Sequence, residues 1–174
     1  MAMALIVSLL IIEQKLFCLS ASPDKKKFFL CVLGGSAVKL LFWTRVIMNI
    51  NDLTGEVIGA AIEVHKHLGP GLLESAYEEC LCHVLRSREI VYERQKPLAI
   101  NYKQVRLDCG YRLDLVVEDK VILELKSCER IEDIHKAQLL TYLKLSGLQL
   151  GLILNFNVPI MKEGIVRVVN NLEE

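Results

Sequence analysis

One stretch of sequence decides the fold of this chain: GYRLDLVV at residues 110–117, EDK at 118–120 and VILELK at 121–126. Aliphatic and branched residues predict a strand on each side, and the charged triplet between them predicts a hairpin turn. Alternate side chains of a strand share a face, so Glu124 and Lys126 should point the same way, away from Leu125. Asp114 should then lie near Glu124 across the ladder.

Three charges in a sheet that is otherwise apolar need an explanation, because burying unpaired charge is costly. A metal site is one common reason for such an arrangement. The simpler interpretation is a Glu-Lys pair that faces solvent at a strand end, since Glu-X-Lys triplets also occur by chance. The segments on either side of the hairpin help to decide between these interpretations.

Upstream of the hairpin, the break Gly69-Pro70-Gly71 precedes a predicted helix over residues 72–88. An apolar stripe at helical spacing is expected on it, formed by Leu73, Tyr77, Leu81 and Val84. Glu74 lies beside that stripe in the first turn. A carboxylate there can supplement a metal site, or it can simply complement the positive end of the helix.

Downstream of the hairpin, a helix is predicted over residues 133–146 and should end at Gly147. The four-residue spacing places Gln138 and Tyr142 on one face of it. An ordinary amphipathic helix that packs on the sheet would have the same pattern. This helix should connect strand 121–126 to a parallel neighbour near 149–155.

The remaining elements follow from the same patterns. A helix is expected over 53–67, and further strands near 91–95, 98–102, 105–108, 111–117 and 165–169.

In chain order, these residues resemble the PD-(D/E)XK nuclease superfamily and, within it, the GxxExxY protein family with its RecB-like pattern. The resemblance covers roughly residues 50–170 and includes VHKHLGPGLLESAY at 64–77, QLLTYL at 138–143 and GLILNF at 151–156. Leu113, where proline is common, precedes Asp114. The resemblance implies an α/β, restriction-endonuclease-like core, in which a central mixed β-sheet is flanked by helices.

The resemblance also implies roles for individual residues. Asp114 and Glu124 would bind Mg²⁺ or Mn²⁺, Lys126 would orient or polarise the attacking water, and Glu74 would supplement the metal site. Gln138 and Tyr142 would support the site or touch the substrate. Hard divalent cations prefer oxygen ligands, and the backbone carbonyl of Leu125, between the two side chains, is a further candidate.

The expected activity is therefore metal-dependent hydrolysis of phosphodiester bonds in nucleic acid, with DNA favoured over RNA. The alternative is a non-catalytic member of the fold that binds nucleic acid or a protein, and the intact Asp114, Glu124 and Lys126 argue against it. A protein partner or a homodimer stays open.

Histidine and cysteine point to no further metal site. His65 and His67 would project about 200° apart on a helix, so they cannot easily share one zinc ion. His65 is expected to complement the negative end of its helix. The six cysteines contain no Cys-x-x-Cys pair, and a reduced cytoplasmic protein with buried thiols is the simplest account: Cys18, Cys31, Cys80, Cys82, Cys109 and Cys128.

The charge is unevenly distributed. The chain has 21 basic and 21 acidic residues. Residues 1–47 hold six of the basic and two of the acidic ones, so residues 48–174 hold 15 basic and 19 acidic residues. A mildly acidic domain argues against a broad electrostatic DNA-binding surface. A local basic groove is one interpretation, and an ordinary mixed-charge surface is the other, which we favour. The groove would be formed by Arg86, Arg88, Arg94, Lys96, Lys103, Arg106 and Arg112.

Residues 1–47 differ from the rest: residues 1–12 are apolar, residues 24–27 are charged, and residues 28–38 are again apolar. Neither apolar run reaches the ~20 residues of a membrane-spanning helix. Residues 1–12 also lack the basic flank of a secretory signal. We expect an extension upstream of a biological start at Met48, followed by a nuclease-like domain over 48–174. Association with a membrane through residues 1–47 is the competing interpretation.

Overall fold

The structure is a computed structural model that describes residues 26–31, 40–45 and 48–171. The chain divides into two compact units, Met1–Met48 and Asn49–Glu174. In the first unit, strands β1 (Lys26–Cys31) and β2 (Leu40–Arg45) pair antiparallel. The apolar run at 1–12 lies outside the described residues. Within those residues, the structure contains no helix with the length and apolar character needed to cross a membrane.

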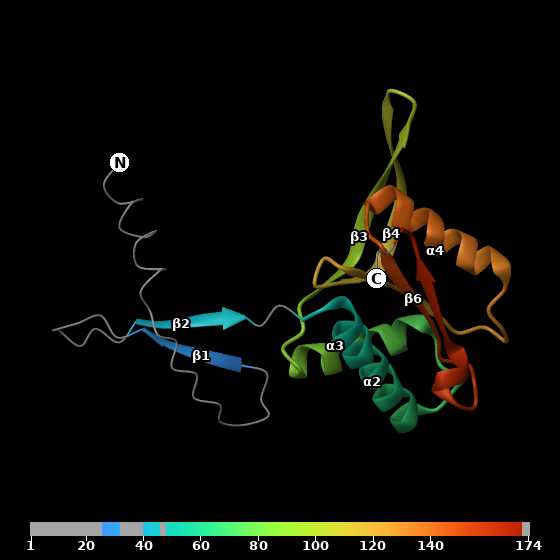
Figure 1. The fold of residues 1–174 in the computed structure, drawn as a ribbon. Helices are drawn as coiled ribbons and strands as arrows, with labels where there is room; N and C mark the ends of the chain where they lie inside the picture. The colour runs from blue at the N-terminus through green and yellow to red at the C-terminus, as the bar shows by residue number, and fades with distance from the viewer. Residues whose placement is uncertain (1–25, 32–39, 46–47, 172–174) are drawn as a thin grey trace. The chain divides into compact units, whose positions relative to one another are not determined.

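Over its described residues, 49–171, the second unit holds three helices, five strands and one short 3-10 helix. In chain order they are α2 (Ile50–Leu68), α3 (Glu74–Ser87), β3 (Tyr92–Tyr102), β4 (Val105–Val117), β5 (Val121–Lys126), α4 (Asp133–Ser146), β6 (Leu150–Asn155), η1 (Met161–Gly164) and β7 (Ile165–Val169). The sheet has the order β3-β4-β5-β6-β7, in which only β5 and β6 pair parallel. Figure 1 shows this sheet with helices packed around it. The predicted α/β fold, a mixed sheet flanked by helices, is confirmed.

The hairpin of β4 and β5 forms where the sequence predicts it. Glu118 and Asp119 turn the chain in the left-handed conformation, with φ of 53° and 51°. Strand β5 is buried on both faces over Val121–Leu125, as expected for a central strand next to a parallel neighbour. The carboxylate of Glu124 therefore lies within the sheet and not at a solvent-facing strand end.

Helix α4 covers the face of the sheet that carries Glu124 and Lys126. One buried cluster joins Leu139, Tyr142 and Leu143 of α4 to Ile122 of β5 and to neighbouring strands. Because alternate side chains of a strand share a face, Glu124 and Lys126 lie on the same side as Ile122. Close packing is aided by Gly151 of β6, where a Cβ atom would lie 2.8 Å from Leu139 Cδ1.

Strands β3 and β4 are longer than predicted. The four short strands expected between residues 91 and 117 lie almost wholly within β3 and β4, but the breaks expected at Pro97 and Gly110 are wrong, because each strand continues across its predicted break. Pro97 lacks an N–H group but is tolerated because β3 is an edge strand. Gly110 adopts a φ of 73° near an irregularity in register between Leu98 and Ile100.

The outer part of β3 and β4 forms a two-stranded arm. Strand β4 pairs with β5 only over residues 115–117, whereas it pairs with β3 from Val105 to Val117. Figure 1 shows this hairpin extending beyond the other strands of the sheet. We refer to residues 98–112 as the arm.

Helix α3 begins two residues later than predicted, and this changes one expected contact. Leu73 is the N-cap residue and is exposed, so its predicted place in the apolar stripe is wrong. Tyr77, Leu81 and Val84 are buried as expected. Glu74 becomes the first residue of the helix.

Candidate active site

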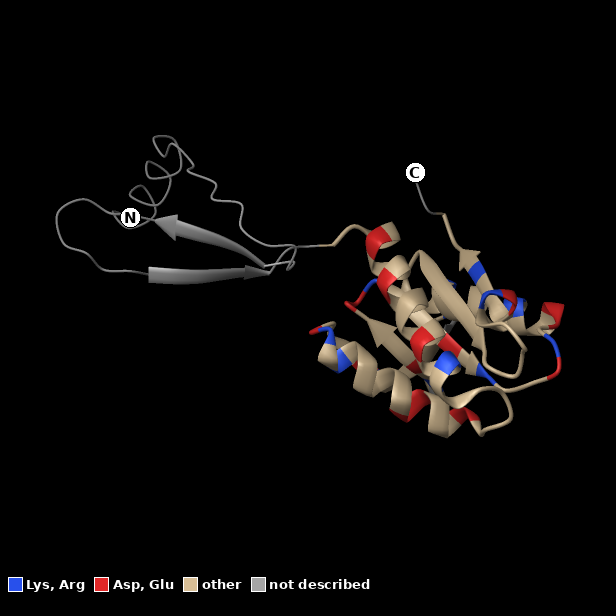
Figure 2. Ribbon diagram, turned by 90° about the horizontal axis from the view of Figure 1, so that it is seen from below, with Lys and Arg blue, Asp and Glu red and all other residues tan. Residues whose placement is uncertain are grey.

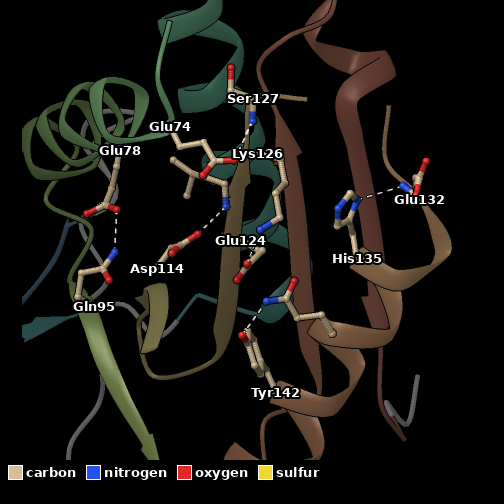
Figure 3. Close-up of polar contacts among 12 residues, drawn as sticks. Glu74, Glu78, Gln95, Asp114, Glu124, Lys126, Ser127, Glu132, His135 and Tyr142 are labelled. Atoms are coloured by element: carbon tan, nitrogen blue, oxygen red, sulfur yellow. Dashed lines mark hydrogen bonds and ion pairs between the residues drawn. The ribbon is translucent and has the colours of Figure 1, made fainter. Parts of the chain in front are cut away.

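The candidate site forms where β4 and β5 separate. The last printed pair of their ladder is Leu115 with Leu123, which places Asp114 opposite Glu124 in the same register. Beyond that pair, the backbone N–H of Leu125 donates to Oδ2 of Asp114 at 2.9 Å. A side-chain oxygen thus accepts a bond at the point where strand pairing stops. Figure 3 shows Asp114 directed toward β5 at this point.

Glu124 is buried, with 4% of its surface exposed, and only one of its oxygens is satisfied. Oε1 accepts a hydrogen bond from Nζ of Lys126 at 2.7 Å. Oε2 is buried and has no hydrogen-bond partner. A buried carboxylate oxygen without a partner is costly, and a cation is one group that would satisfy it.

The electrostatics of the site favour an additional cation. Burial raises the pKa of Asp114, and the charges of Glu78 and Glu74 add to that effect. Burial, followed by the charge of Asp114, raises the pKa of Glu124. A divalent cation between the two carboxylates would offset both effects, because it stabilises their charged forms.

Lys126 is held in its charged form. Burial opposes the charge, but the hydrogen bond with Glu124 and the nearby carboxylates outweigh it, so the pKa of Lys126 is raised. A charged lysine beside carboxylates can donate hydrogen bonds to a water or to a phosphate oxygen.

Glu74 lies at the rim of the site and is fixed by the residue after Lys126. Its Oε1 accepts from the backbone N–H of Ser127 at 3.0 Å, and Ser127 Oγ donates to the Leu72 carbonyl at 2.7 Å. The charge of Glu74 acts on Asp114, Glu124 and Lys126. The structure therefore brings Glu74 to the site, with one of its oxygens bonded to backbone (Figure 3).

Two hydrogen bonds of the Tyr77 hydroxyl fix the loop that precedes Glu74. Tyr77 OH donates to the Gly69 carbonyl at 2.7 Å and accepts from the Leu72 N–H at 3.1 Å. Gly71 takes a φ of 101°, a region that residues with a Cβ atom rarely adopt. The buried Tyr77 thereby ties the Gly-Pro-Gly break to helix α3.

Gln138 and Tyr142 bond to each other on α4. Gln138 Nε2 donates to Tyr142 OH at 2.7 Å. Tyr142 is buried, and its ring makes an edge contact with Tyr111, with 6.4 Å between ring centroids. Figure 3 shows Tyr142 on α4, below Glu124 and Lys126 in that view, and α4 covers the face of the sheet on which these two residues lie.

Two residues beside the site were not identified from the sequence. Glu78 of α3 is buried, and its carboxylate accepts from Arg94 Nε at 2.8 Å and from Gln95 Nε2 at 2.9 Å. Gln95 has a φ of 49°. Its neighbours in β3 pair with Leu115 and Leu113 of β4, so Gln95 lies opposite Asp114 across the ladder. The four-residue spacing of Glu74 and Glu78 on one helix face was the available signal.

The local basic groove is only partly present, and the mixed-charge surface is the better description. Most of the seven candidates bond to neighbours: Arg86 to Tyr92, Arg88 to Glu56 and Glu63, Arg94 to Glu78 and Glu79, Lys96 to Glu93 and Asp119, and Arg112 to the Gln95 carbonyl. Figure 2 shows basic and acidic residues interspersed over the drawn face of the domain.

His65 lies at the negative end of its helix, as predicted, and it also makes a contact with a distant loop. It lies in the last turn of α2, but its ring is buried and Nε2 donates to the Val158 carbonyl at 2.8 Å. Its position is thus explained by packing against the loop after β6. Cys80, Cys82 and Cys128 are free thiols, and Cys82 is buried.

A divalent cation fits the donors at Asp114 and Glu124. In the described part of the chain, no three His, Cys, Asp or Glu side chains gather closely enough to hold a metal together. Mg²⁺ usually keeps several waters and needs only one or two carboxylates. The unpaired Oε2 of Glu124 and the raised pKa values of Asp114 and Glu124 agree with such a ligand.

A family model described as the PD-(D/E)XK nuclease superfamily matches residues 51–168. The chain therefore belongs to the PD-(D/E)XK nuclease superfamily. The matched region contains the whole candidate site, from Glu74 to Tyr142. No curated protein and no solved structure matches the chain.

Proposed function

We propose that this protein is a metal-dependent nuclease of the GxxExxY type, which hydrolyses phosphodiester bonds in DNA in preference to RNA. The observation that carries the proposal is the buried Asp114–Glu124 pair with the unsatisfied Oε2 of Glu124. Membership of a nuclease superfamily whose members generally hydrolyse phosphodiester bonds supports it.

In this proposal, Asp114, Glu124 and the carbonyl of Leu125 hold Mg²⁺ or Mn²⁺, and Glu74 supplements the site. A bound divalent ion lowers the pKa of water and stabilises negative charge that develops on a phosphate. Asp114 is already positioned by the Leu125 N–H, so little rearrangement of the two strands is required. The carboxylates supply the hard oxygen ligands that such ions prefer.

Lys126 orients the attacking water or binds a phosphate oxygen. Its ammonium group is held by Oε1 of Glu124 and keeps its charge, so it can donate to either group. Gln138 and Tyr142 support the α4 side of the site through their hydrogen bond. We place this chemistry in a domain over 48–174, preceded by an extension at 1–47, in a cytoplasmic protein.

Cleavage of end-labelled DNA and RNA, single- and double-stranded, tests the proposal. The purified full chain is incubated with Mg²⁺, Mn²⁺ or EDTA, beside Glu124→Gln and Lys126→Met variants. We expect metal-dependent cutting that falls at least about 100-fold in both variants, the usual effect of removing a positioned charge at a phosphate-cleaving site. Glu129→Gln, at an exposed glutamate, is the matched control.

Cutting that persists in Glu124→Gln at the wild-type rate would contradict the proposed site. A protein that binds the oligonucleotides but leaves them intact with every metal would instead be the non-catalytic member of the fold. The same assay compares DNA with RNA, so preferential cutting of RNA would overturn the substrate assignment alone.

A further inference from the structure

Tyr111 is an exposed aromatic residue close to the candidate site. It lies three residues before Asp114 on β4, and 47% of its surface is exposed. One edge contact orients its ring, with Tyr142 at 6.4 Å and an interplanar angle of 62°. Because Tyr142 is buried and bonded to Gln138, this contact fixes the ring from beneath and leaves much of Tyr111 open to solvent.

The local backbone explains why Tyr111 stands at this border. It pairs with Leu98, which is buried in the cluster under α4, and it follows Gly110 with its φ of 73°. Farther along the arm, Val105 and Leu107 are also exposed. Tyr111 thus lies where the packed sheet ends and the arm begins, on the strand that leads to Asp114.

The composition of the arm differs from that of the domain as a whole. The arm holds Lys103, Arg106 and Arg112 and a single acidic residue, Asp108, within a domain that has 15 basic and 19 acidic residues. Arg112 is exposed, and its guanidinium makes one long contact of 3.4 Å with the Gln95 carbonyl. An open aromatic ring followed directly by the exposed Arg112, on an arm whose sequence is mostly basic, complements a nucleic-acid chain, which offers phosphates and flat bases.

We propose that Tyr111 stacks against an unpaired base and that Arg112 contacts a neighbouring phosphate, so that the site takes single-stranded DNA or the unpaired end of a duplex. The proposal rests on the proposed function, because the nuclease site determines which strand runs past Tyr111. A paired and stacked base hides its faces inside the duplex, whereas an unpaired base can turn one toward an aromatic side chain. The single strand is therefore the form that this surface recognises.

Oligonucleotide binding is measured in EDTA, which removes the divalent ion and so prevents metal-dependent cutting. The measurement therefore tests the proposal separately from catalysis. The full chain is titrated into a fluorescein-labelled oligothymidylate, a duplex of the same length, and an abasic oligonucleotide with the same number of phosphates. We expect the single strand to bind more tightly than the duplex. Tyr111→Ala should weaken oligothymidylate binding about tenfold and leave abasic binding unchanged.

Three variants separate stacking from charge and from damage to the arm. Tyr111→Phe keeps the ring and should bind oligothymidylate like the wild type. Arg112→Ala should weaken binding of the base-containing and abasic strands alike and reduce the salt dependence, because it removes a phosphate contact. Leu107→Ala, at another exposed apolar residue of the arm, should leave both affinities unchanged.

The proposal is overturned if duplex and single strand bind equally, or if Tyr111→Ala binds both single strands as the wild type does. It is also overturned if Tyr111→Ala changes the sedimentation of the free protein and not its affinity for DNA, since the arm would then contact a second copy. Failure of the proposed function would appear instead as absence of metal-dependent cutting, in an assay that this binding measurement does not use.

Discussion

Asp114 combines a structural contact with an unfavourable charge, and one substitution can separate them. Its Oδ2 accepts the Leu125 N–H, while burial and the charges of Glu78 and Glu74 raise its pKa. Asparagine retains an acceptor oxygen for the backbone and removes the charge. The geometry of the strands and the chemistry of the site therefore place different demands on residue 114.

We predict that Asp114→Asn raises the free energy of unfolding of the metal-free protein at neutral pH by about 0.5–2 kcal/mol, the usual range for stabilising substitutions. Cutting should fall at least about 100-fold, because a metal carboxylate is lost. Urea unfolding and the cleavage assay measure the two effects. Asp119→Asn, at an exposed turn position, should change stability by less than about 0.5 kcal/mol. If the Asp114→Asn protein is less stable than the wild type, the charge of Asp114 stabilises the folded state, which would contradict the prediction.

The raised pKa values of Asp114 and Glu124 also predict a pH dependence. In the unfolded chain these groups have ordinary pKa values of 3.8 and 4.5, and in the folded protein both are raised. The folded state therefore binds their protons more tightly. As the pH falls through the raised values toward the ordinary ones, these two groups add stability to the metal-free protein.

Metal binding should respond with the opposite sign, because a cation competes with the protons. We predict that Mn²⁺ affinity, measured by calorimetry, falls as the pH is lowered from about 7 to about 5. The stabilisation that saturating Mn²⁺ gives against thermal unfolding should shrink over the same interval. Constant affinity across it would mean that Asp114 and Glu124 do not bind the ion.

At the scale of elements, the site depends on how closely α4 approaches the sheet. Gly151 of β6 provides the space, since a Cβ atom there would lie 2.8 Å and 2.9 Å from the two methyl carbons of the buried Leu139. Leu139 follows Gln138 directly, so displacement of this part of α4 also displaces Gln138 from the site.

We predict that Gly151→Ala lowers the free energy of unfolding by about 1–3 kcal/mol, the common cost of overpacking a core. It should also reduce cutting, because Gln138 and Tyr142 move with α4. Gly55→Ala is the matched control: a Cβ atom at this position in α2 has nothing within 4 Å, and alanine favours helix by up to about 1 kcal/mol. Equal stability of the two variants would show that the sheet adjusts to the added methyl group.

The elements that the sequence predicted well are those with local signals. Asp114 and Glu124 belong to one hairpin, and alternation along β5 predicts which face Glu124 and Lys126 share. Gln138 and Tyr142 are one helical turn apart, and their hydrogen bond follows from that spacing. Local periodicity was therefore sufficient for the hairpin and for the face of α4.

The parts that were missed depend on distant contacts or on unusual backbone. Glu78 meets Gln95, 17 residues away, only because α3 packs beside β3. Gln95 and Gly110 lie inside long strands and have positive φ, whereas the sequence pattern predicted a strand end at Gln95 and a gap between two strands at Gly110. The start of α3 at Glu74 left Leu73 exposed, a detail of capping that periodicity does not resolve.

At the scale of the molecule, the chain consists of two compact units, and the whole candidate site lies in Asn49–Glu174. This unit has its own five-stranded sheet and a core in which Leu115, Leu123 and Leu152 are fully buried. A single domain of this size can bury enough apolar surface to fold alone.

We predict that a protein containing only residues 49–174 unfolds cooperatively and cuts DNA within about twofold of the rate of the full chain. Circular dichroism during heating and the cleavage assay measure these properties. The intact mass of the native protein is the companion measurement, because an amino terminus at Met1 would contradict a biological start at Met48. A truncated protein that is unfolded or inactive would show that residues 1–48 contribute to the catalytic unit.

The bond between Leu125 and Asp114 has a consequence for hydrogen–deuterium exchange. The Leu125 amide is protected by a side chain and not by a neighbouring strand, so its exposure depends on how the Asp114 carboxylate is engaged. An ion that fixes this carboxylate should slow exchange at that one amide, while amides deep in the ladder, such as that of Leu123, change little. A backbone position in the middle of the sheet would thereby report whether the site is loaded, without any substrate being cut.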